Sequence, residues 1–297
     1  MHQRSFFVIV IGFGLVVVSG AVLANPGDLY VTNFGQDLLK FAPNGTQSTY
    51  ASGFNTSNGI AFDSSGNLFV SNGQNPAEIL KFTPSGSQST FTSGLNNVFG
   101  MAFGATGNLF VTSNPSVIYE FAPDGTRTTF ASGLNGPYGL AFDHSGNLFV
   151  ADRGSGSILE FTPGGSETMF ATGLDNPSYL AFDSAGNLWM TQYTDASNPD
   201  GGLYEFASNG TKTFIVGMAF AAGLAFNGAG TLFVADGGNQ IVELMPDHTL
   251  MTFASGINNP AYLAFEGQTL PVPEPSMDTL LVFGAGIGSA WLSRRRC

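Results

Sequence analysis

A chain of 297 residues in which 43% are hydrophobic and only 10% are charged is long enough to bury a sizeable core. Its formal net charge of -12 argues against nucleic-acid binding, which relies on Lys and Arg to neutralise phosphates. The 40 glycines and the low charge favour an all-β protein of short strands and tight turns. The single cysteine, Cys297, is the last residue, so no disulfide forms within the chain.

The first 24 residues have the composition of a secretory signal peptide. A basic start, Met1–Arg4, precedes an apolar run, Phe6–Val18, and the segment ends in Val22-Leu23-Ala24. Small residues at these positions are what signal peptidase requires, and we predict cleavage after Ala24. An uncleaved anchor helix is the alternative. Both readings predict an exported protein.

The body of the chain, residues 25–270, repeats one unit about every forty residues. The clearest copy is Tyr138–Asp152, in which a strand ending in Gly-Leu-Ala-Phe, an Asp-His-Ser-Gly turn and a strand Asn-Leu-Phe-Val-Ala-Asp form a hairpin. The Phe that ends the first strand recurs at spacings of 41, 39, 40, 44 and 39 residues. A third strand such as Leu159-Glu-Phe161 and a fourth such as Thr168-Met-Phe170 follow in each unit.

Six units of four strands predict a six-bladed β-propeller. The chain enters at the second strand of a blade, near Asp28, and leaves at a first strand that ends at Phe265. We therefore expect the C-terminal strand to complete the N-terminal blade and close the ring, which leaves no open sheet edge. A linear solenoid would need polar capping repeats instead.

The repeated frame resembles NHL repeats and the related SMP-30/gluconolactonase-like and streptogramin-lyase-like propellers. The residues that carry the resemblance are the Gly-Leu-Ala-Phe-Asp-x-x-Gly-Asn-Leu-Phe-Val-Ala-Asp pattern and the preceding Gly-Pro or Asn-Pro, as in Gly136-Pro137 and Asn176-Pro177. The resemblance covers Asn25–Glu266. It implies the propeller fold and is weak for activity, because propellers carry many unrelated functions.

One mouth of the central channel is predicted to carry a ring of polar side chains. The loops that enter first strands and leave second strands open on the same face. Their residues make up the predicted ligand site: Asn33, Asn72, Ser113, Tyr138, Asp152, Gln192, Tyr193 and Asp236. Converging oxygen donors suit Ca²⁺, another divalent metal or a polyhydroxylated ligand, and Asp152 and Asp236 are the metal candidates. The competing interpretation is that these side chains cap turns locally.

The 44-residue spacing places a longer loop, Thr191–Gly202, over the same mouth. It carries Tyr193, Asp195, Asn198 and Asp200, and long loops on one face of a repeat array often mark the functional face. A tolerated surface insertion is the alternative.

Catalysis has less support from the sequence. None of the three histidines is placed as a general base beside the channel. The gluconolactonase resemblance implies a metal held by Glu, Asn and Asp, but the glutamates Glu78, Glu120, Glu160, Glu205 and Glu243 all fall in third strands, away from the axis. A streptogramin-lyase-like His and Glu pair is not found. We therefore expect a binding or scaffold module, with a metal-dependent lactonase or related hydrolase as the alternative.

The C-terminal residues 271–297 form a three-part tail. Val272, Pro273, Glu274 and Pro275 precede an apolar run, Thr279–Leu292, and three arginines before Cys297. Arginines at this end are retained on the cytoplasmic side, which leaves the body outside. The tail resembles the PEP-CTERM sorting signal of Gram-negative bacteria. That resemblance implies membrane attachment, processing by an exosortase, and an exopolysaccharide or cell-envelope ligand at the cell surface. A plain membrane anchor is the alternative, and we expect a monomer.

Overall fold

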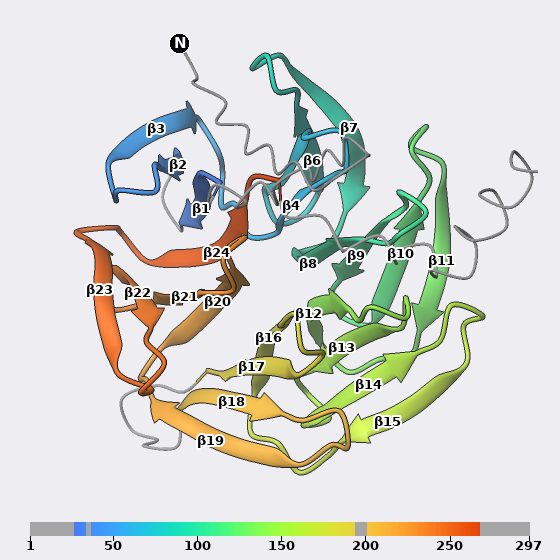
Figure 1. Ribbon diagram of the computed structural model, residues 1–297. Coiled ribbons are helices and arrows are strands. Elements are labelled where there is room, and N and C mark those ends of the chain that lie inside the picture. Colours follow the sequence, from blue (N-terminus) through green and yellow to red (C-terminus); the bar gives the residue numbers. More distant parts are fainter. Residues whose placement is uncertain (1–26, 34–36, 194–200, 268–297) are drawn as a thin grey trace, which may run out of the picture.

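The computed structural model describes residues 27–33, 37–193 and 201–267, and these form six four-stranded antiparallel sheets around one axis (Figure 1). Blade 1 has the strand order β24-β1-β2-β3, and blades 2 to 6 follow in chain order with four consecutive strands each. The six-bladed β-propeller predicted from the repeats is confirmed.

Within each blade, the four strands follow one another outward from the axis in the order of the sheet. The innermost strands are β24 (Pro260–Phe265), β4 (Ile60–Phe62), β8 (Val98–Phe103), β12 (Pro137–Phe142), β16 (Pro177–Phe182) and β20 (Ala221–Phe226). The second strands are β1 (Leu29–Asn33), β5 (Leu68–Asn72), β9 (Leu109–Ser113), β13 (Leu148–Asp152), β17 (Leu188–Gln192) and β21 (Leu232–Asp236). The third strands are β2 (Asp37–Phe41), β6 (Ala77–Phe82), β10 (Val117–Phe121), β14 (Ser157–Phe161), β18 (Gly202–Phe206) and β22 (Gln240–Leu244). The outer strands are β3 (Gln47–Ser52), β7 (Gln88–Leu95), β11 (Arg127–Ser132), β15 (Glu167–Ala171), β19 (Lys212–Gly217) and β23 (Leu250–Ser255).

The ring closes where the two ends of the propeller meet. Strand β24 pairs antiparallel with β1 in a register that sets Leu29 opposite Phe265 and Val31 opposite Leu263. The backbone amide of Glu266 extends the pairing by donating to the carbonyl of Asp28 at 3.0 Å. In Figure 1 the red-orange β24 lies beside the blue β1. The half-blade offset in the sequence therefore becomes the closure of the ring.

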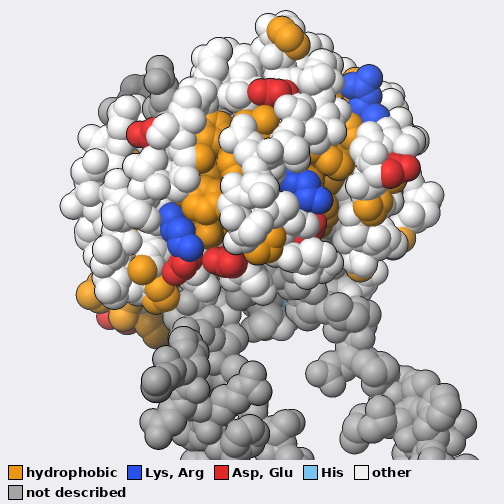
Figure 2. All heavy atoms as spheres, turned by 90° about the horizontal axis from the view of Figure 1, so that it is seen from above, with side chains coloured by type: hydrophobic (Ala, Val, Ile, Leu, Met, Phe, Trp, Pro, Cys, Tyr) orange, Lys and Arg blue, Asp and Glu red, His pale blue; other side chains and the backbone are white. Residues whose placement is uncertain are grey.

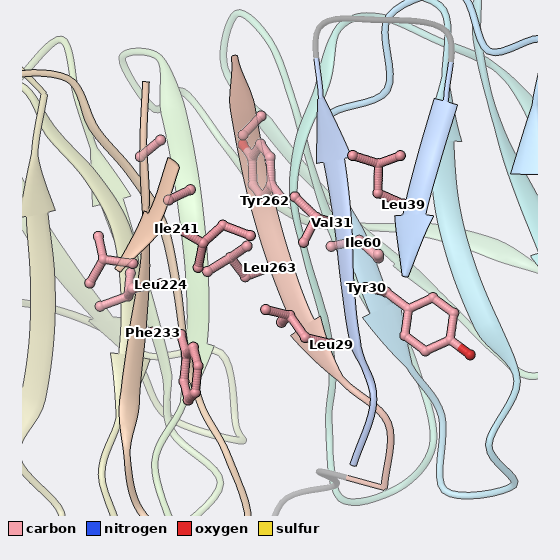
Figure 3. Close-up of a cluster of buried hydrophobic side chains, with 14 of the residues drawn as sticks. Leu29, Tyr30, Val31, Leu39, Ile60, Leu224, Phe233, Ile241, Tyr262 and Leu263 are labelled. Carbon is pink, nitrogen blue, oxygen red and sulfur yellow. The ribbon is translucent and has the colours of Figure 1, made fainter. Parts of the chain in front are cut away.

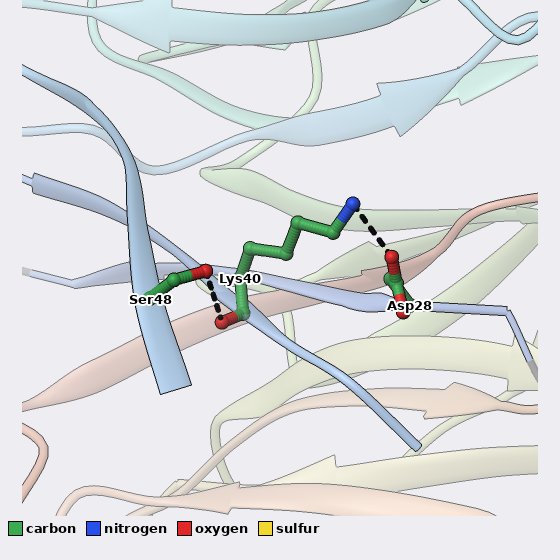
Figure 4. Close-up of polar contacts among 3 residues, drawn as sticks. All are labelled: Asp28, Lys40 and Ser48. Atoms are coloured by element: carbon green, nitrogen blue, oxygen red, sulfur yellow. Dashed lines mark hydrogen bonds and ion pairs between the residues drawn. The ribbon is translucent and has the colours of Figure 1, made fainter. Parts of the chain in front are cut away.

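One ion pair lies beside this closure. Lys40 Nζ on β2 contacts Asp28 Oδ2 at 2.6 Å (Figure 4). Burial pulls the pKa of Lys40 down, but hydrogen bonds to Asp28 and to the phenol of Tyr30 outweigh it and raise the pKa above its usual value. Among the described residues this is the single ion pair between side chains, so charge pairing plays a small part in this fold.

The repeated Asp of the hairpin turn has a local structural role. Asp143 Oδ1 accepts hydrogen bonds from the backbone amides of Ser145 and Asn147, and its Oδ2 accepts one from the Asn147 side chain. Gly146 in the same turn has a φ of +84°, which explains the Gly at this position. The turn motif is thus a self-contained unit that reads directly from the sequence.

The aromatic residues of the motif form the core between blades. Phe149 on β13 meets Phe170 on β15 and Phe182 of the next blade edge to face, with ring centroids 5.1 and 4.9 Å apart. The same geometry recurs around the ring, and such contacts add to the apolar area that they bury. Figure 3 shows part of the hydrophobic cluster at the closure of the ring, to which Leu29, Val31 and Leu263 belong.

The Gly of the Gly-Leu-Ala-Phe motif lets neighbouring blades approach at the axis. A Cβ atom on Gly139 would lie 2.4 Å from the carbonyl oxygen of Ser178, and one on Gly223 would lie 2.4 Å from that of Ala261. Such contacts are too short for any side chain. Blades 5 and 1 have Tyr179 and Tyr262 at the equivalent position. Their Cα atoms would lie 2.8 and 2.7 Å from a Cβ on Gly139 and on Gly223, so the backbone of the next blade fills the space beside each glycine.

The surface is sparsely charged. On the face shown in Figure 2, the few basic side chains lie near acidic ones, and hydrophobic side chains are visible between them. The predicted signal peptide at 1–24 and the predicted sorting tail at 271–297 lie outside the described residues. Within the described ranges, no helix is long and apolar enough to cross a membrane.

Candidate functional site

The second strands end at the mouth of the channel where the first strands begin, as predicted. Asp152 pairs with Pro137, Gln192 with Pro177 and Asp236 with Ala221, each of which is the first residue of its inner strand. Asn33 and Ser113 hold equivalent places opposite Pro260 and Val98, and Asn72 ends β5. The structure therefore brings the predicted ring residues to one end of the channel, here called the polar mouth.

Several ring residues make local hydrogen bonds with the loop that precedes the inner strand. Asp152 Oδ1 accepts from the amide of Asn135 at 2.8 Å, and Asn72 Oδ1 accepts from that of Asn55 at 2.7 Å. Ser113 bonds both the amide and the carbonyl of Asn96. These bonds are the turn-capping role that the sequence left open as the alternative, and they fix the loops of the mouth in place.

The two carboxylates proposed for a metal are engaged within the chain. Asp152 Oδ2 accepts from the Ser155 hydroxyl at 2.6 Å, and Asp236 accepts from the Gly238 amide and the Gln240 side chain. In the described part of the chain, no group of three His, Cys, Asp or Glu side chains comes together. These residues do not supply the Glu, Asn and Asp set that a gluconolactonase-like metal requires, and we derive no catalytic step through a metal.

Glu78 differs from the other third-strand glutamates. It lies at the mouth end of β6, where its Oε1 accepts a hydrogen bond from Asn72 Nδ2 at 3.0 Å. Its second oxygen accepts from Thr90 at 3.3 Å, toward the outer strand. The sequence correctly predicted a third-strand position away from the axis, but it did not show that Glu78 would contact a ring residue.

Three tyrosines cluster on the axis just inside the polar mouth. The rings of Tyr179 and Tyr262 meet edge to face with centroids 4.4 Å apart, and Tyr138 lies 5.2 Å from the first and 6.4 Å from the second. Phe99 stacks on the other side of Tyr138 at 4.4 Å. We call Tyr138, Tyr179 and Tyr262 the tyrosine cluster. Sequence analysis named only Tyr138; the signal it missed is that Tyr replaces the motif Gly in two blades.

The tyrosine cluster is neutral and contains one unsatisfied group. Burial, followed by the neighbouring phenols, raises the pKa of Tyr179 and of Tyr262 well above the usual value. Burial also raises the pKa of Tyr138. The Tyr262 hydroxyl is buried beside the phenols of Tyr138 and Tyr179, which act on its pKa through hydrogen-bond as well as coulombic interactions. None of the described residues forms a hydrogen bond of good geometry with it. A buried hydroxyl without a partner is costly, so this atom suits a ligand or a water.

One guanidinium lies over the cluster. Arg153 follows β13, and its Cζ is 5.3 Å from the ring centroid of Tyr138 and 5.3 Å from that of Tyr193. Its Nε donates to Asn176 Oδ1 at 3.4 Å. No carboxylate of the described residues pairs with Arg153, although the chain from Asp28 to Glu266 has 19 acidic and five basic side chains. Sequence analysis did not single out Arg153.

The residue three positions before the motif Gly has a left-handed backbone in all six blades. The set is Thr56 (φ 65°), Asn97 (φ 36°), Gly136 (φ 72°), Asn176 (φ 46°), Phe220 (φ 62°) and Asn259 (φ 46°). Asn and Gly accept this conformation readily, whereas a bulky aromatic residue does not. The β-branched Thr56 and the aromatic Phe220 are therefore the two outliers, and the Phe220 ring lies 6.1 Å from that of Tyr193 at the mouth. Phe220 lies in the turn before β20, outside the strands.

The opposite end of the channel is apolar. A pocket of about 360 Å³ opens there, lined by the Ala-Phe pairs that end the inner strands, with Leu224, Ser64, Gly104, Ala105 and Gly107. The pairs are Ala61-Phe62, Ala102-Phe103, Ala141-Phe142, Ala181-Phe182, Ala225-Phe226 and Ala264-Phe265. The Phe side chains at the ends of the inner strands therefore line this pocket as well as packing between blades. It contains no ionisable side chain, so the polar chemistry of the channel is at the other mouth.

Comparison with solved structures supports the fold. The chain is similar to a chain of a nidogen/laminin complex, with a TM-score of 0.71 and 17% identity over 82% of this chain and 99% of that one. It is also similar to virginiamycin B lyase from Staphylococcus aureus, with a TM-score of 0.60 and 15% identity over 84% and 91%. A gluconolactonase from Xanthomonas campestris matches with a TM-score of 0.60 and 19% identity over 72% and 85%.

Identities this low establish a six-bladed propeller with neighbours in the gluconolactonase, virginiamycin B lyase and NHL-like group, and nothing about activity. No protein-family model matches the sequence, and no curated protein matches it.

Proposed function

We propose that this chain is an exported, surface-tethered β-propeller that acts as a binding or scaffold module. The observation that carries the proposal is the composition of the polar mouth, where aromatic rings and one guanidinium converge from several blades. Stacking surfaces and hydrogen-bond donors of this kind retain a ligand, whereas the carboxylates at this mouth, Asp152 and Asp236, are held by hydrogen bonds within the chain. The pattern of the mouth therefore favours binding.

Export and tethering rest on the two ends of the chain. Met1–Ala24 supports secretion, and Val272–Pro275 with the following apolar run and arginines supports retention at the membrane and processing by an exosortase. An exopolysaccharide or another cell-envelope component is the ligand class that fits this location in a Gram-negative bacterium. The test is cell fractionation of a strain that produces the full chain with and without Pro273→Ala and Glu274→Ala. Surface retention of the unaltered chain and altered processing of the variant are expected.

Binding is tested on the segment 25–270, because the ring closes within it through β24 and β1. We expect it to retain envelope polysaccharide in a pull-down. Tyr138→Ala, which removes the central ring of the mouth, should abolish retention. His144→Ala, a change in an exposed turn, should not.

A metal-dependent lactonase is the second candidate, favoured by the gluconolactonases among the structural neighbours. The same segment, prepared without chelator, should contain no stoichiometric divalent metal and should not hydrolyse aldonolactones. One Ca²⁺, Zn²⁺ or Mn²⁺ per chain that is lost in Asp152→Ala or Asp236→Ala, together with lactone turnover, would replace the binding proposal by the lactonase.

A further inference from the structure

We propose that the polar mouth binds a ring-shaped ligand that carries a single carboxylate, such as a uronic-acid unit, with Arg153 holding the carboxylate and the tyrosines holding the ring. This inference rests on the binding function proposed above and names the ligand class of that site. Five blades contribute to it, through Phe99, Tyr138 with Arg153, Tyr179 with Tyr193, Phe220, and Tyr262.

The surroundings of Arg153 suit the binding of a carboxylate. The rings of Tyr138 and Tyr193 contact the guanidinium at 5.3 Å each, and one N–H bonds Asn176. These contacts hold the side chain in place and leave most of its N–H donors without a partner among the described residues. A planar fork of free N–H groups is matched by a carboxylate, which accepts two parallel hydrogen bonds.

The tyrosine cluster is the second feature of the polar mouth that suits this ligand. The Tyr262 side chain is only 7% exposed, and its hydroxyl has no hydrogen bond of good geometry to any described residue. A ligand hydroxyl or carboxylate oxygen that reaches it would satisfy an atom that is costly to leave unpaired. Since Tyr138 and Phe99 are partly exposed and stacked, they present aromatic faces on which the apolar face of a sugar ring can lie.

Backbone strain at the mouth is an independent indication that the site is functional. Phe220 occupies a left-handed position that Asn, Gly or Thr fills in the other five blades. A strained backbone persists only where the surrounding structure holds it in place, and strained residues are concentrated at binding and active sites. At this position the aromatic ring serves the mouth, where it faces Tyr193.

The net charge limits the ligand to one carboxylate, or to few. The chain from Asp28 to Glu266 has 14 more acidic than basic side chains, so the net charge of the surface repels a polyanion. A monoanion gains the local attraction of Arg153 and experiences little of the overall repulsion. The site therefore fits an isolated acidic unit within or at the end of a mostly neutral chain.

The test compares methyl glucuronoside with methyl glucoside, which differ only in the carboxylate, by calorimetric titration of the segment 25–270. The glucuronoside should bind at least about tenfold more tightly, which is the effect of one charge-assisted hydrogen bond. Arg153→Gln should remove this preference. Arg127→Gln is the matched control, because Arg127 also stacks on a tyrosine, Tyr119 at 4.9 Å, but on an outer strand.

The possible outcomes separate this inference from the proposed function. Equal binding of both glycosides that is lost in Tyr138→Ala would overturn the carboxylate inference and leave the binding module standing. Unchanged preference in Arg153→Gln, equal loss in Arg127→Gln, or no binding of the glucuronoside would also overturn the inference. Absence of any glycan binding together with lactone turnover would remove both proposals.

Discussion

Replacing Tyr262 by phenylalanine should make the propeller more stable. The Tyr262 hydroxyl is buried and has no hydrogen-bond partner among the described residues. Folding therefore removes it from water without compensation, which costs about 1–3 kcal/mol in proteins. Phenylalanine keeps the ring contacts with Tyr179 at 4.4 Å and omits the cost. We expect the free energy of unfolding to rise by about 1–2 kcal/mol, which for a chain of this size raises Tm by about 2–4 °C per kcal/mol.

Thr112→Val is the matched control. The Thr112 hydroxyl is also fully buried, but it accepts from the Gly100 amide at 2.7 Å and donates to the Tyr138 carbonyl at 2.9 Å, which joins blades 3 and 4. Its removal should cost about 1–3 kcal/mol, because the Gly100 amide loses its partner. Both variants are compared by urea unfolding of the segment 25–270, with the slope of the transition monitored for unchanged cooperativity.

A loss of stability in Tyr262→Phe would refute the reasoning, because it would mean that the hydroxyl is satisfied in the folded protein. If the variant is instead more stable and also binds the glucuronoside more weakly, the hydroxyl is retained for binding at the expense of stability. That combination would tie the unpaired atom directly to the ligand site.

Three further outcomes follow from the geometry. Gly139→Ala should destabilise the protein by about 1–3 kcal/mol, because its Cβ would lie 2.4 Å from the Ser178 carbonyl; Gly164→Ala, where the nearest atom is 3.9 Å away, should be neutral in the same thermal melt. Phe220→Asn should be more stable than Phe220→Ala by about 1 kcal/mol in urea unfolding, because Asn tolerates the φ of 62°; equal stability would count against strain at this site. The raised pKa of Lys40 means that its ion pair stabilises the protein fully below the unfolded lysine value near 10.4 and is lost as pH rises above it; Lys40→Met should flatten this alkaline decline in Tm.

The repeats could be read almost completely from the sequence. Hairpin turns such as the one at Asp143, Gly146 and Asn147 depend on residues within five positions of one another. Each strand depends on apolar residues that alternate along a few positions. Such interactions are local, so their positions predict the blades and their number. The offset between Asp28 and Phe265 predicted the closing strand for the same reason, because a half blade at each end has only one partner that completes it.

The candidate site depends on contacts between residues far apart in the sequence, and these contacts could not be predicted from the sequence. Asp152 was the strongest candidate by charge, but its oxygens are bonded to Asn135 and Ser155, whose positions only the folded loop defines. The functional candidates are Tyr138 and Tyr193, which the sequence predicted, together with Arg153 and Tyr262, which it did not. Arg153 lies over the rings of Tyr138 and Tyr193, and Tyr138 in turn contacts Tyr262 from another blade. The sequence by itself determined the blades, the turns and the closure of the ring, since these rest on neighbours along the chain. Only the tertiary structure decided which side chains fill the channel, because that depends on the direction of side chains from strands about forty or more residues apart.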